Sequence, residues 1–277
     1  MEKEGKNIFG KSGQGKDLQT DHHVDFFRKK KAQVTIFIIV AIVIVIIGIF
    51  IYLFYPSIKS SLGLETKNPS QFLQDCLATD LKNSIDKLGV TGGSFAPENY
   101  IAYKGDKIEY LCYTKEYYKP CVNQKPNLVG SIEGEIYQSL KDKASFCFDS
   151  MKQNYENAGY TIDVSNEKVQ VLLLPKRVAV YFNGTITLTR GESQRYRGFS
   201  VVLNNNLYEL ASIAQSIVNW EASYGDTEVT RYMDYYRNLK VQKLKRDDGS
   251  KIFIIEDTNT ENKFQFATRS YAFPAGY

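Results

Sequence analysis

The chain has 277 residues, of which 43% are hydrophobic and 24% are charged. This composition is typical of a folded protein and excludes a chain that is disordered throughout. The 35 basic and 31 acidic residues give a net charge of +4, and residues 1–32 carry +3 of it, with eight Lys/Arg against five Asp/Glu. The rest of the chain is close to neutral, with interspersed signs. We therefore expect no binding to nucleic acid.

Residues 33–55 are almost wholly apolar, and no charged residue occurs from Ile36 to Tyr55. A helix of this length, at about 1.5 Å per residue, spans a hydrocarbon core of about 30 Å. Tyr52 and Tyr55 stand where an interfacial aromatic belt belongs, and we expect Pro56 to end the helix at the membrane surface. The sequence therefore predicts a single-pass transmembrane helix over residues 33–55, embedded in the lipid bilayer.

The flanks of this segment predict its orientation. Arg28–Lys31 adjoin its N-terminal end, whereas the other side has only Lys59 and then Lys67. The positive-inside rule leaves residues 1–32 in the cytoplasm and places residues 56–277 outside the cell. A cleaved secretory signal is the competing interpretation, but its apolar core has about 7–15 residues and ends in small residues. We expect an uncleaved anchor, or one trimmed on its cytoplasmic side.

The junction Lys30-Lys-Ala-Gln-Val-Thr-Ile-Phe37 resembles the class III leader junction of archaeal type IV pilin-like proteins. This resemblance implies cleavage between Ala32 and Gln33 by a prepilin-type peptidase. The chain departs from the bacterial pilin pattern in its long leader and in having Phe37 where a glutamate stands. The alternative is that basic residues at a membrane face occur without any processing.

From Lys29 onward the chain resembles a family of uncharacterised membrane-anchored proteins from small-genome archaea. The resemblance rests on short patches in the same order, which are Lys31–Phe37, Cys76-Leu77, Ile132-Glu133, Cys147-Phe148, Arg177–Val180, Ile213-Ala214 and Phe264–Arg269. Because that family has no established activity, the resemblance implies membrane anchoring and no catalytic residue.

Beyond a connector at residues 56–68, residues 69–277 predict an α+β extracytoplasmic domain of amphipathic helices and antiparallel strands, with a subdivision near residue 160. Pro69 begins a first helix that Gly89 ends, and Ser131 caps a second helix that ends at Ala158-Gly159. Asn183-Gly184 predicts the tip of a hairpin. We expect further elements in order, namely strands over 169–174, 177–182 and 198–203, helices over 207–221 and 227–237, and a final meander over 239–244, 252–255 and 264–269.

All four cysteines lie in the part predicted to be outside, where an even number predicts two disulfides. Of the three pairings, we favour Cys112 with Cys121 as a local link and Cys76 with Cys147 as a link between the first two outer helices. A four-cysteine zinc site is the alternative, but it lacks two close C-x2-4-C pairs. The thiols would be free if the orientation were reversed.

No catalytic constellation, metal site or cofactor site is predicted. His22 and His23 are the only histidines, and both belong to the predicted cytoplasmic tail. The outer part therefore cannot contain a Ser-His-Asp triad or a histidine-ligated metal. A carboxylate-pair hydrolase is not excluded. We interpret the basic cluster Lys240, Lys243, Lys245 and Arg246 as a solvated strand edge.

Asn183-Gly184-Thr185 is also an acceptor sequon, so the sequence predicts glycosylation at Asn183. Taken together, the anchor, the leader-like junction and the cysteines favour a pilin-like or envelope-associated protein with a structural or adhesive role. Such a protein would contact other envelope or filament proteins. The predicted break at Pro56 favours an anchored head over a filament subunit. The alternatives are an anchored ligand-binding or sensor module and an anchored extracellular hydrolase.

Overall fold

The structure is a computed structural model that describes residues 29–61 and 68–272. The chain divides into two units, Met1–Leu64 and Glu65–Tyr277, and each is described here by itself. Most of the predicted cytoplasmic tail, including His22 and His23, lies outside the described residues, as do residues 62–67 of the predicted connector.

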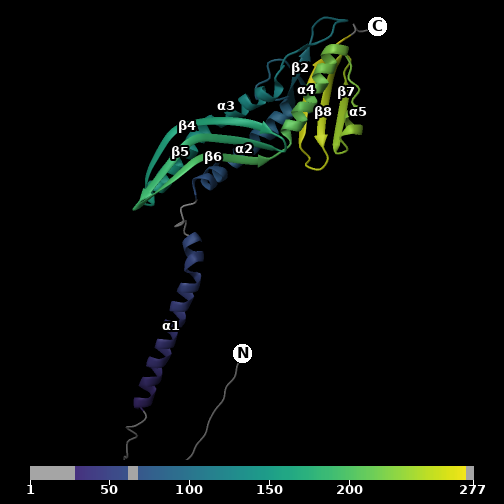
Figure 1. Cartoon of the computed structure of the whole chain (residues 1–277). Helices are drawn as coiled ribbons and strands as arrows, with labels where there is room; N and C mark the ends of the chain where they lie inside the picture. Colours follow the sequence, from purple (N-terminus) through teal and green to yellow (C-terminus); the bar gives the residue numbers. More distant parts are fainter. Residues whose placement is uncertain (1–28, 62–67, 273–277) are drawn as a thin grey trace, which may run out of the picture. The chain divides into compact units, whose positions relative to one another are not determined.

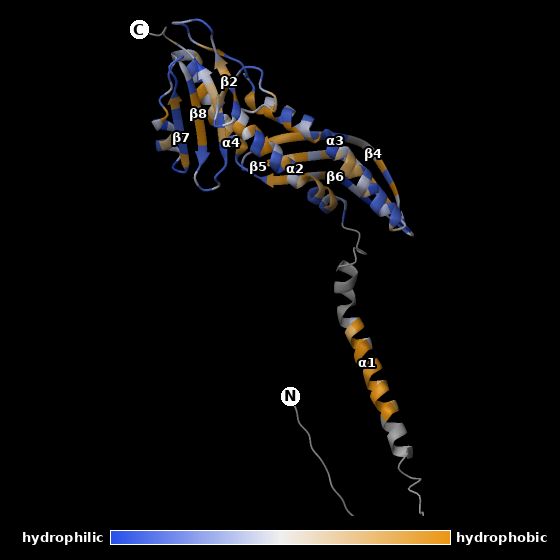
Figure 2. Ribbon diagram, turned by 180° about the vertical axis from the view of Figure 1, so that it is seen from behind, coloured by the Kyte–Doolittle hydropathy of each residue, from blue (hydrophilic) through white to orange (hydrophobic). Residues whose placement is uncertain are grey.

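The first unit contains one long helix, α1 (Lys29–Ser61). The helix continues through Pro56 for five more residues, so the prediction that Pro56 ends it was wrong. Proline removes one backbone donor, but the hydrogen bonds of the flanking turns are sufficient to carry the helix past it. Along the stretch with described side chains, Ile36–Tyr52, the large apolar residues are all exposed, and Figure 2 shows this stretch in orange.

Within the described part of the chain, no helix meets both the length and the apolarity that a membrane crossing requires. The predicted span, residues 33–55, extends beyond the described side chains of α1 at both ends. The side chains of Ala32 and Gln33, at the predicted processing site, also lie outside them.

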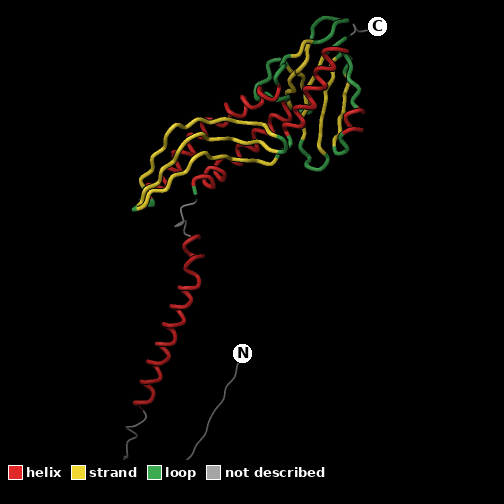
Figure 3. Tube along the Cα trace, in the orientation of Figure 1, coloured by secondary structure: helices red, strands yellow, loops and turns green. Residues whose placement is uncertain are grey.

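The second unit is an α+β domain with two sheets (Figures 1 and 3). Its helices are α2 (Pro69–Thr91), α3 (Leu128–Asn157), α4 (Leu207–Tyr224) and α5 (Thr230–Tyr235). Its strands are β1 (Tyr100–Tyr103), β2 (Asp106–Tyr113), β3 (Val122–Asn123), β4 (Thr161–Leu174), β5 (Arg177–Arg190), β6 (Glu192–Asn204), β7 (Leu239–Lys245), β8 (Ser250–Asp257) and β9 (Lys263–Arg269).

The smaller sheet is an antiparallel meander of three long strands in the order β4-β5-β6. The predicted hairpin tip at Asn183-Gly184 was wrong, because β5 runs through these residues and only its register shifts there. The turn after β5 lies instead at Gly191, with a φ of 76°, and the turn between β4 and β5 lies at Pro175-Lys176, where Lys176 adopts a φ of 62°. Proline presets φ at the second position of such a turn. The irregularity at Asn183-Gly184 is a bulge, and bulges bend strands, which agrees with the curved strands in Figure 1.

Helices α2 and α3 pack against each other and along this sheet. Helix α2 begins at Pro69 as predicted, but it ends at Gly92 rather than at Gly89. A Cβ at Gly89 would lie 2.5 Å from the carbonyl oxygen of Lys263, so this glycine permits close approach of β9. Helix α3 begins at Leu128, capped by the Asn127 side chain instead of Ser131, and it ends at Ala158-Gly159 as predicted.

The larger sheet has the order β1-β2-β9-β8-β7, with β3 paired to β2. Strands β2 and β9 pair in parallel, unlike every other strand pair described, whereas the predicted closing meander β7-β8-β9 is antiparallel. Helix α4 packs on this sheet, and one apolar core includes residues from both sides of position 160. Strand β7 lies at the edge, which is the position predicted for the basic cluster.

Two disulfides link these elements, Cys76–Cys147 between α2 and α3 and Cys112–Cys121 between β2 and the segment before β3. The prediction of disulfide bonds is confirmed, and these are the pairs that the sequence favoured. The described residues include no free cysteine.

Candidate functional site

A large cavity of the second unit lies where the end of β6 meets α4, α5 and the loops that flank β7 and β8. Its volume is about 1230 Å³. Asparagines contribute much of its polar lining, since Asn204–Asn206, Asn238, Asn259 and Asn262 all border it. Three tyrosines of α5 and its C-terminal end complete one wall, namely Tyr232, Tyr235 and Tyr236. Such a concave surface with convergent polar groups is the usual form of a ligand site.

A second cavity of about 490 Å³ adjoins the first. Its lining includes the only tryptophan of the chain, Trp220. The two cavities share Ser216, Tyr232, Tyr235 and Tyr236, so they meet along one wall. At this meeting point the Ser216 and Tyr232 hydroxyls form a hydrogen bond of 2.8 Å. We call the two connected cavities the α4–α5 groove.

One stripe of α4 runs along both cavities. Tyr208, Ser212, Ser216 and Trp220 recur every four residues, and the first three line the larger cavity while the last two line the smaller one. Residues four apart lie on one face of a helix, so a single helical face forms the length of the groove. The opposite face of α4 is buried, with Ala211, Ala214, Ile217 and Val218 in the core.

Hydrogen bonds fix the asparagine-rich floor of the groove. The Asn262 side-chain amide donates to the Asn206 Oδ1 at 2.7 Å, and Asn206 donates in turn to the Asp257 Oδ2 at 2.7 Å. The other carboxylate oxygen of Asp257 accepts from the backbone N–H of Asn259 at 2.8 Å. Because each polar group restrains the next, the floor is preformed and is not assembled by a ligand.

Other polar groups in the groove have no hydrogen-bond partner among the residues that the structure describes. The side-chain amides of Asn204, Asn238 and Asn259 are exposed, and we find no hydrogen bond from them to any residue that the structure describes. The same holds for the hydroxyls of Tyr235 and Tyr236, both of which are exposed. These groups can both donate and accept hydrogen bonds.

Two carboxylates border the larger cavity, but both have structural roles. Asp257 holds the floor as described above, and the Glu209 Oε1 accepts from the backbone N–H of Lys176 at 2.9 Å. The second oxygen of Glu209 is buried without a hydrogen-bond partner among the described residues. A typical glycoside hydrolase needs one carboxyl group to donate a proton and another to act as base or nucleophile. The arrangement fits binding better than hydrolysis.

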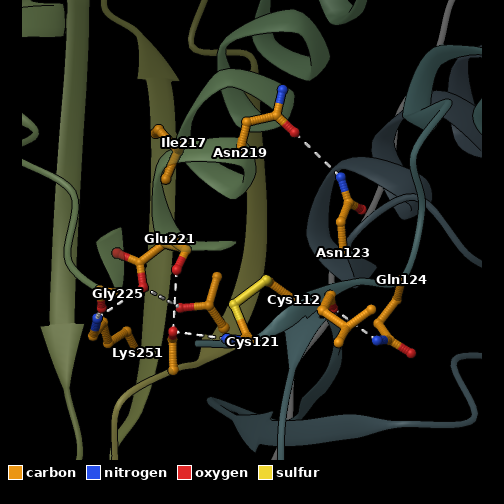
Figure 4. The surroundings of a disulfide bond; sticks show 12 residues. Cys112, Cys121, Asn123, Gln124, Ile217, Asn219, Glu221, Gly225 and Lys251 are labelled. Carbon is orange, nitrogen blue, oxygen red and sulfur yellow. Dashed lines mark hydrogen bonds and ion pairs between the residues drawn. A yellow bond between two sulfur atoms is a disulfide. The ribbon is translucent and has the colours of Figure 1, made fainter. Parts of the chain in front are cut away.

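Beneath the groove, the buried face of α4 carries an ion pair that Figure 4 shows beside the Cys112–Cys121 disulfide. Glu221 is fully buried, and its Oε2 lies 2.7 Å from the Lys251 Nζ and 3.2 Å from the Thr268 hydroxyl. Its Oε1 accepts from the backbone N–H of Thr227 at 2.8 Å, and Lys251 also donates to the Gly225 carbonyl. Since every charged atom has a partner, this cluster fixes α4 on the sheet and leaves no atom free for chemistry.

Asp226 extends this charged cluster to the surface. Its carboxylate accepts hydrogen bonds from Lys243 and lies 3.2 Å from Lys251. Burial alone would raise the pKa of Asp226, but the Lys243 hydrogen bond and the charges of the two lysines lower this pKa to about 2. Two residues of the predicted basic cluster, Lys243 and Lys245, are therefore paired with an acidic residue of the α4–α5 segment.

A second buried acid lies on β2, far from the groove in sequence. Burial raises the pKa of the Glu109 carboxyl, and the ion pair with Lys125 at 3.4 Å opposes this shift. The described residues contain no group of acidic, cysteine or histidine side chains that could hold a metal ion.

The residues singled out from the sequence do not come together in one site. The cysteines form two separate links, with Cα–Cα distances of 6.0 Å for Cys76–Cys147 and 5.3 Å for Cys112–Cys121. Asn183 is exposed on β5 at the bulge, so glycosylation there stays a prediction. None of these residues lines the α4–α5 groove.

Sequence reasoning missed the groove because its residues have ordinary local roles. The run Asn204–Asn206 reads as the junction of a strand and a helix, where asparagine is favoured for its turn and capping geometry. The tyrosine-rich stretch 227–237 was predicted to be helical, and α5 forms only part of it. The available signal was the four-residue spacing of Tyr208, Ser212, Ser216 and Trp220, which places an aromatic-polar stripe opposite the apolar one.

Comparison of the chain with protein-family models, with curated proteins and with solved structures finds no match.

Proposed function

We propose that this chain is a membrane-anchored protein of the cell envelope that displays its second unit outside the cell and acts there by binding. The α4–α5 groove is the single observation that carries the binding role. The groove combines a preformed floor, exposed aromatic side chains and polar groups that have no partner within residues 29–61 and 68–272. Its two carboxylates have structural partners, which favours adhesion or ligand capture over hydrolysis.

The membrane anchor is supported by the uncharged run Ile36–Tyr55 and by the exposed apolar side chains of α1. Charge at the flanks supports the orientation, because Arg28–Lys31 lie on the N-terminal side alone. Both disulfides lie in the second unit and support its placement in an oxidising compartment. Cleavage between Ala32 and Gln33 by a prepilin-type peptidase belongs to the same proposal and rests on the leader-like junction alone.

Two experiments on the full chain in its native membrane test this proposal. Surface labelling of intact cells should modify lysines of the second unit, and it should leave Lys3–Lys16 unmodified in any chain that N-terminal sequencing finds uncleaved. Intact-mass analysis with N-terminal sequencing should find four cysteines oxidised, and it reports leader cleavage and glycosylation of Asn183 at the same time. Free thiols, together with a second unit protected in intact cells, would rule out the placement.

The alternative, an anchored sensor module, shares the groove and differs in what the binding does. A sensor must transmit occupancy across the membrane to the cytoplasmic residues, whereas an adhesin needs only to hold its ligand. Cleavage of the leader would itself reject a sensor that signals through residues 1–32, and in the uncleaved chain the replacement of residues 1–28 with an unrelated basic sequence separates the two. Retention of all cellular phenotypes of the wild type supports the adhesive role, and their loss with binding intact supports the sensor.

A further inference from the structure

Resting on the proposed function, we further infer that the α4–α5 groove binds a neutral glycan chain. Three properties of the groove lining support this class of ligand, namely its aromatic faces, its amides and its balance of charge.

Exposed aromatic side chains provide flat surfaces along the groove. Tyr235 is 79% exposed, Tyr236 and Trp220 are each 48% exposed, and all three border a cavity. The rings of Tyr235 and Tyr236 lie 4.7 Å apart at 76°, so each presents a different plane. An aromatic face carries partial negative charge and attracts the positively polarised C–H groups that line one face of a sugar ring.

The unpartnered amides and hydroxyls match the other chemistry of a sugar. Each sugar hydroxyl can donate and accept hydrogen bonds. The side-chain amides of Asn204, Asn238 and Asn259 can do the same, since each has an NH2 donor and a carbonyl acceptor. A peptide would instead need a sheet edge or apolar pockets for its side chains. Asparagines and tyrosines make up ten of the 20 residues that border the larger cavity, whereas only Leu210, Ile213 and Leu239 are apolar, and this balance favours a glycan.

Charge argues against an anionic ligand. Lys176 and Arg237 border the larger cavity, and Glu209 and Asp257 offset them. In the smaller cavity Arg231 faces two acids, Asp226 and Glu228. A surface that recognises phosphate or sulfate groups has an excess of arginine and lysine, which is absent from both linings. We therefore exclude acidic polysaccharides and nucleic acids.

The size of the groove indicates an oligosaccharide. Sites for a single small molecule have volumes of about 300–1,000 Å³. The larger cavity alone has about 1230 Å³, and the smaller one continues it past the Ser216–Tyr232 hydrogen bond. The stripe on α4 extends for more than three helical turns, so several sugar units fit along it.

The test uses the full chain in nanodiscs on an array that presents neutral, sulfated and sialylated glycans. We expect binding to neutral glycans, and we expect the double variant Tyr235→Ala/Tyr236→Ala to weaken it at least tenfold. The matched control is Tyr137→Ala, which removes an exposed tyrosine of α3 outside the groove. This control should bind as the wild type does. Asn238→Ala should weaken binding to a smaller extent.

Three results would overturn the inference. These are no binding to any neutral glycan, equal or tighter binding to sulfated glycans, and equal loss in Tyr137→Ala and Tyr235→Ala/Tyr236→Ala. The circular dichroism spectrum of each variant separates loss of binding from loss of folding. If no glycan on the array binds while the second unit is still labelled on intact cells, the glycan inference is rejected. The proposal that the chain is an anchored surface protein then still stands. If a peptide library then binds and the tyrosine double variant abolishes that binding, the groove has a peptide ligand.

Discussion

The helices α2 and α3 and the helices α4 and α5 cover their sheets with different kinds of residue. Helix α2 buries a leucine stripe, Leu73, Leu77, Leu81 and Leu88, and a disulfide joins it to α3. Helix α4 buries an apolar face too, but it also buries a charged residue, Glu221, and turns a stripe of tyrosine, serine and tryptophan toward a groove. The groove stripe of α4 consists of polar and aromatic groups that stability does not require, and α2 has no such stripe along a groove.

This difference indicates which surface of the second unit is functional, although the chain has no recognisable catalytic motif. Helix α4 has an aromatic and polar stripe on its outer face and a buried charge, Glu221, on its inner face. Both features depart from simple apolar packing, and together they indicate a surface that is held in place for binding. The Glu221–Lys251 pair fixes α4 against β8, and the groove lies on the other side of the same helix. We therefore expect substitutions in the two helix pairs to change stability by different amounts.

The largest effect is expected from breaking the buried ion pair on one side. Glu221→Ala leaves Lys251 buried with fewer partners, which typically costs about 3–5 kcal/mol of unfolding free energy. The double variant Glu221→Leu/Lys251→Met should recover most of this loss because no unpaired charge remains. Urea denaturation measures both. A loss below about 1 kcal/mol in Glu221→Ala would show that the pair does not hold α4.

The two disulfides should differ in their contribution because they close loops of different length. The sequence separation is 71 residues for Cys76–Cys147 and 9 for Cys112–Cys121. The loop-entropy model assigns them about 4 and about 3 kcal/mol. We expect Cys76→Ala/Cys147→Ala to lower the unfolding midpoint more than Cys112→Ala/Cys121→Ala. The reverse order would indicate that the α2–α3 seam is stable without its link.

A smaller effect is expected in acid, at the exposed edge of the charged cluster. The folded-state pKa of Asp226 is lowered from 3.8 to about 2, so its ionised form stabilises the fold above about pH 4. This contribution is lost as the pH falls through 2. Because the Asp226 side chain is half exposed, we expect its contribution to the unfolding free energy to be less than about 1 kcal/mol. Asp226→Asn should flatten the stability profile between pH 4 and 2, and an unchanged profile would contradict this assignment.

The smallest effect on stability is expected in the groove. Tyr235 is exposed and its hydroxyl has no described partner, so Tyr235→Ala should change the unfolding free energy by less than about 0.5 kcal/mol. The matched substitution on the other helix pair, Leu81→Ala, should cost about 2–5 kcal/mol because Leu81 is fully buried. A large loss in Tyr235→Ala would make the tyrosines part of the core and remove the contrast between the two pairs.

Elements with a strong period could be predicted from the sequence. The predicted first helix from Pro69 corresponds to α2, and the predicted final meander corresponds to β7, β8 and β9. Predicted boundaries failed where a residue had a tertiary role, as at Gly89, which admits the backbone of Lys263. Asn183-Gly184 failed for a related reason, since the same dipeptide suits a tight turn and a bulge.

The candidate site could not be predicted because its residues come from separate segments. Asn206, Asp257 and Asn262 meet only after β6, β8 and α4 have packed together. The parallel pairing of β2 with β9 is equally non-local, because it joins strands at opposite ends of the domain. The disulfide pairs were predictable from local sequence. Cys76 adjoins Leu77 in the predicted first helix, and Cys147 lies at helical spacing from Leu140 and Met151 in the predicted second helix.

The most direct test of the α4–α5 groove uses its own tryptophan. Trp220 is the only tryptophan of the chain and borders the groove, so its fluorescence reports occupancy without a label. We predict that titration of the full chain in nanodiscs with a neutral glycan that binds on the array shifts the Trp220 emission to saturation. Tyr235→Ala/Tyr236→Ala should move the midpoint at least tenfold. Unchanged emission at concentrations that saturate the array would place the ligand elsewhere and contradict the account.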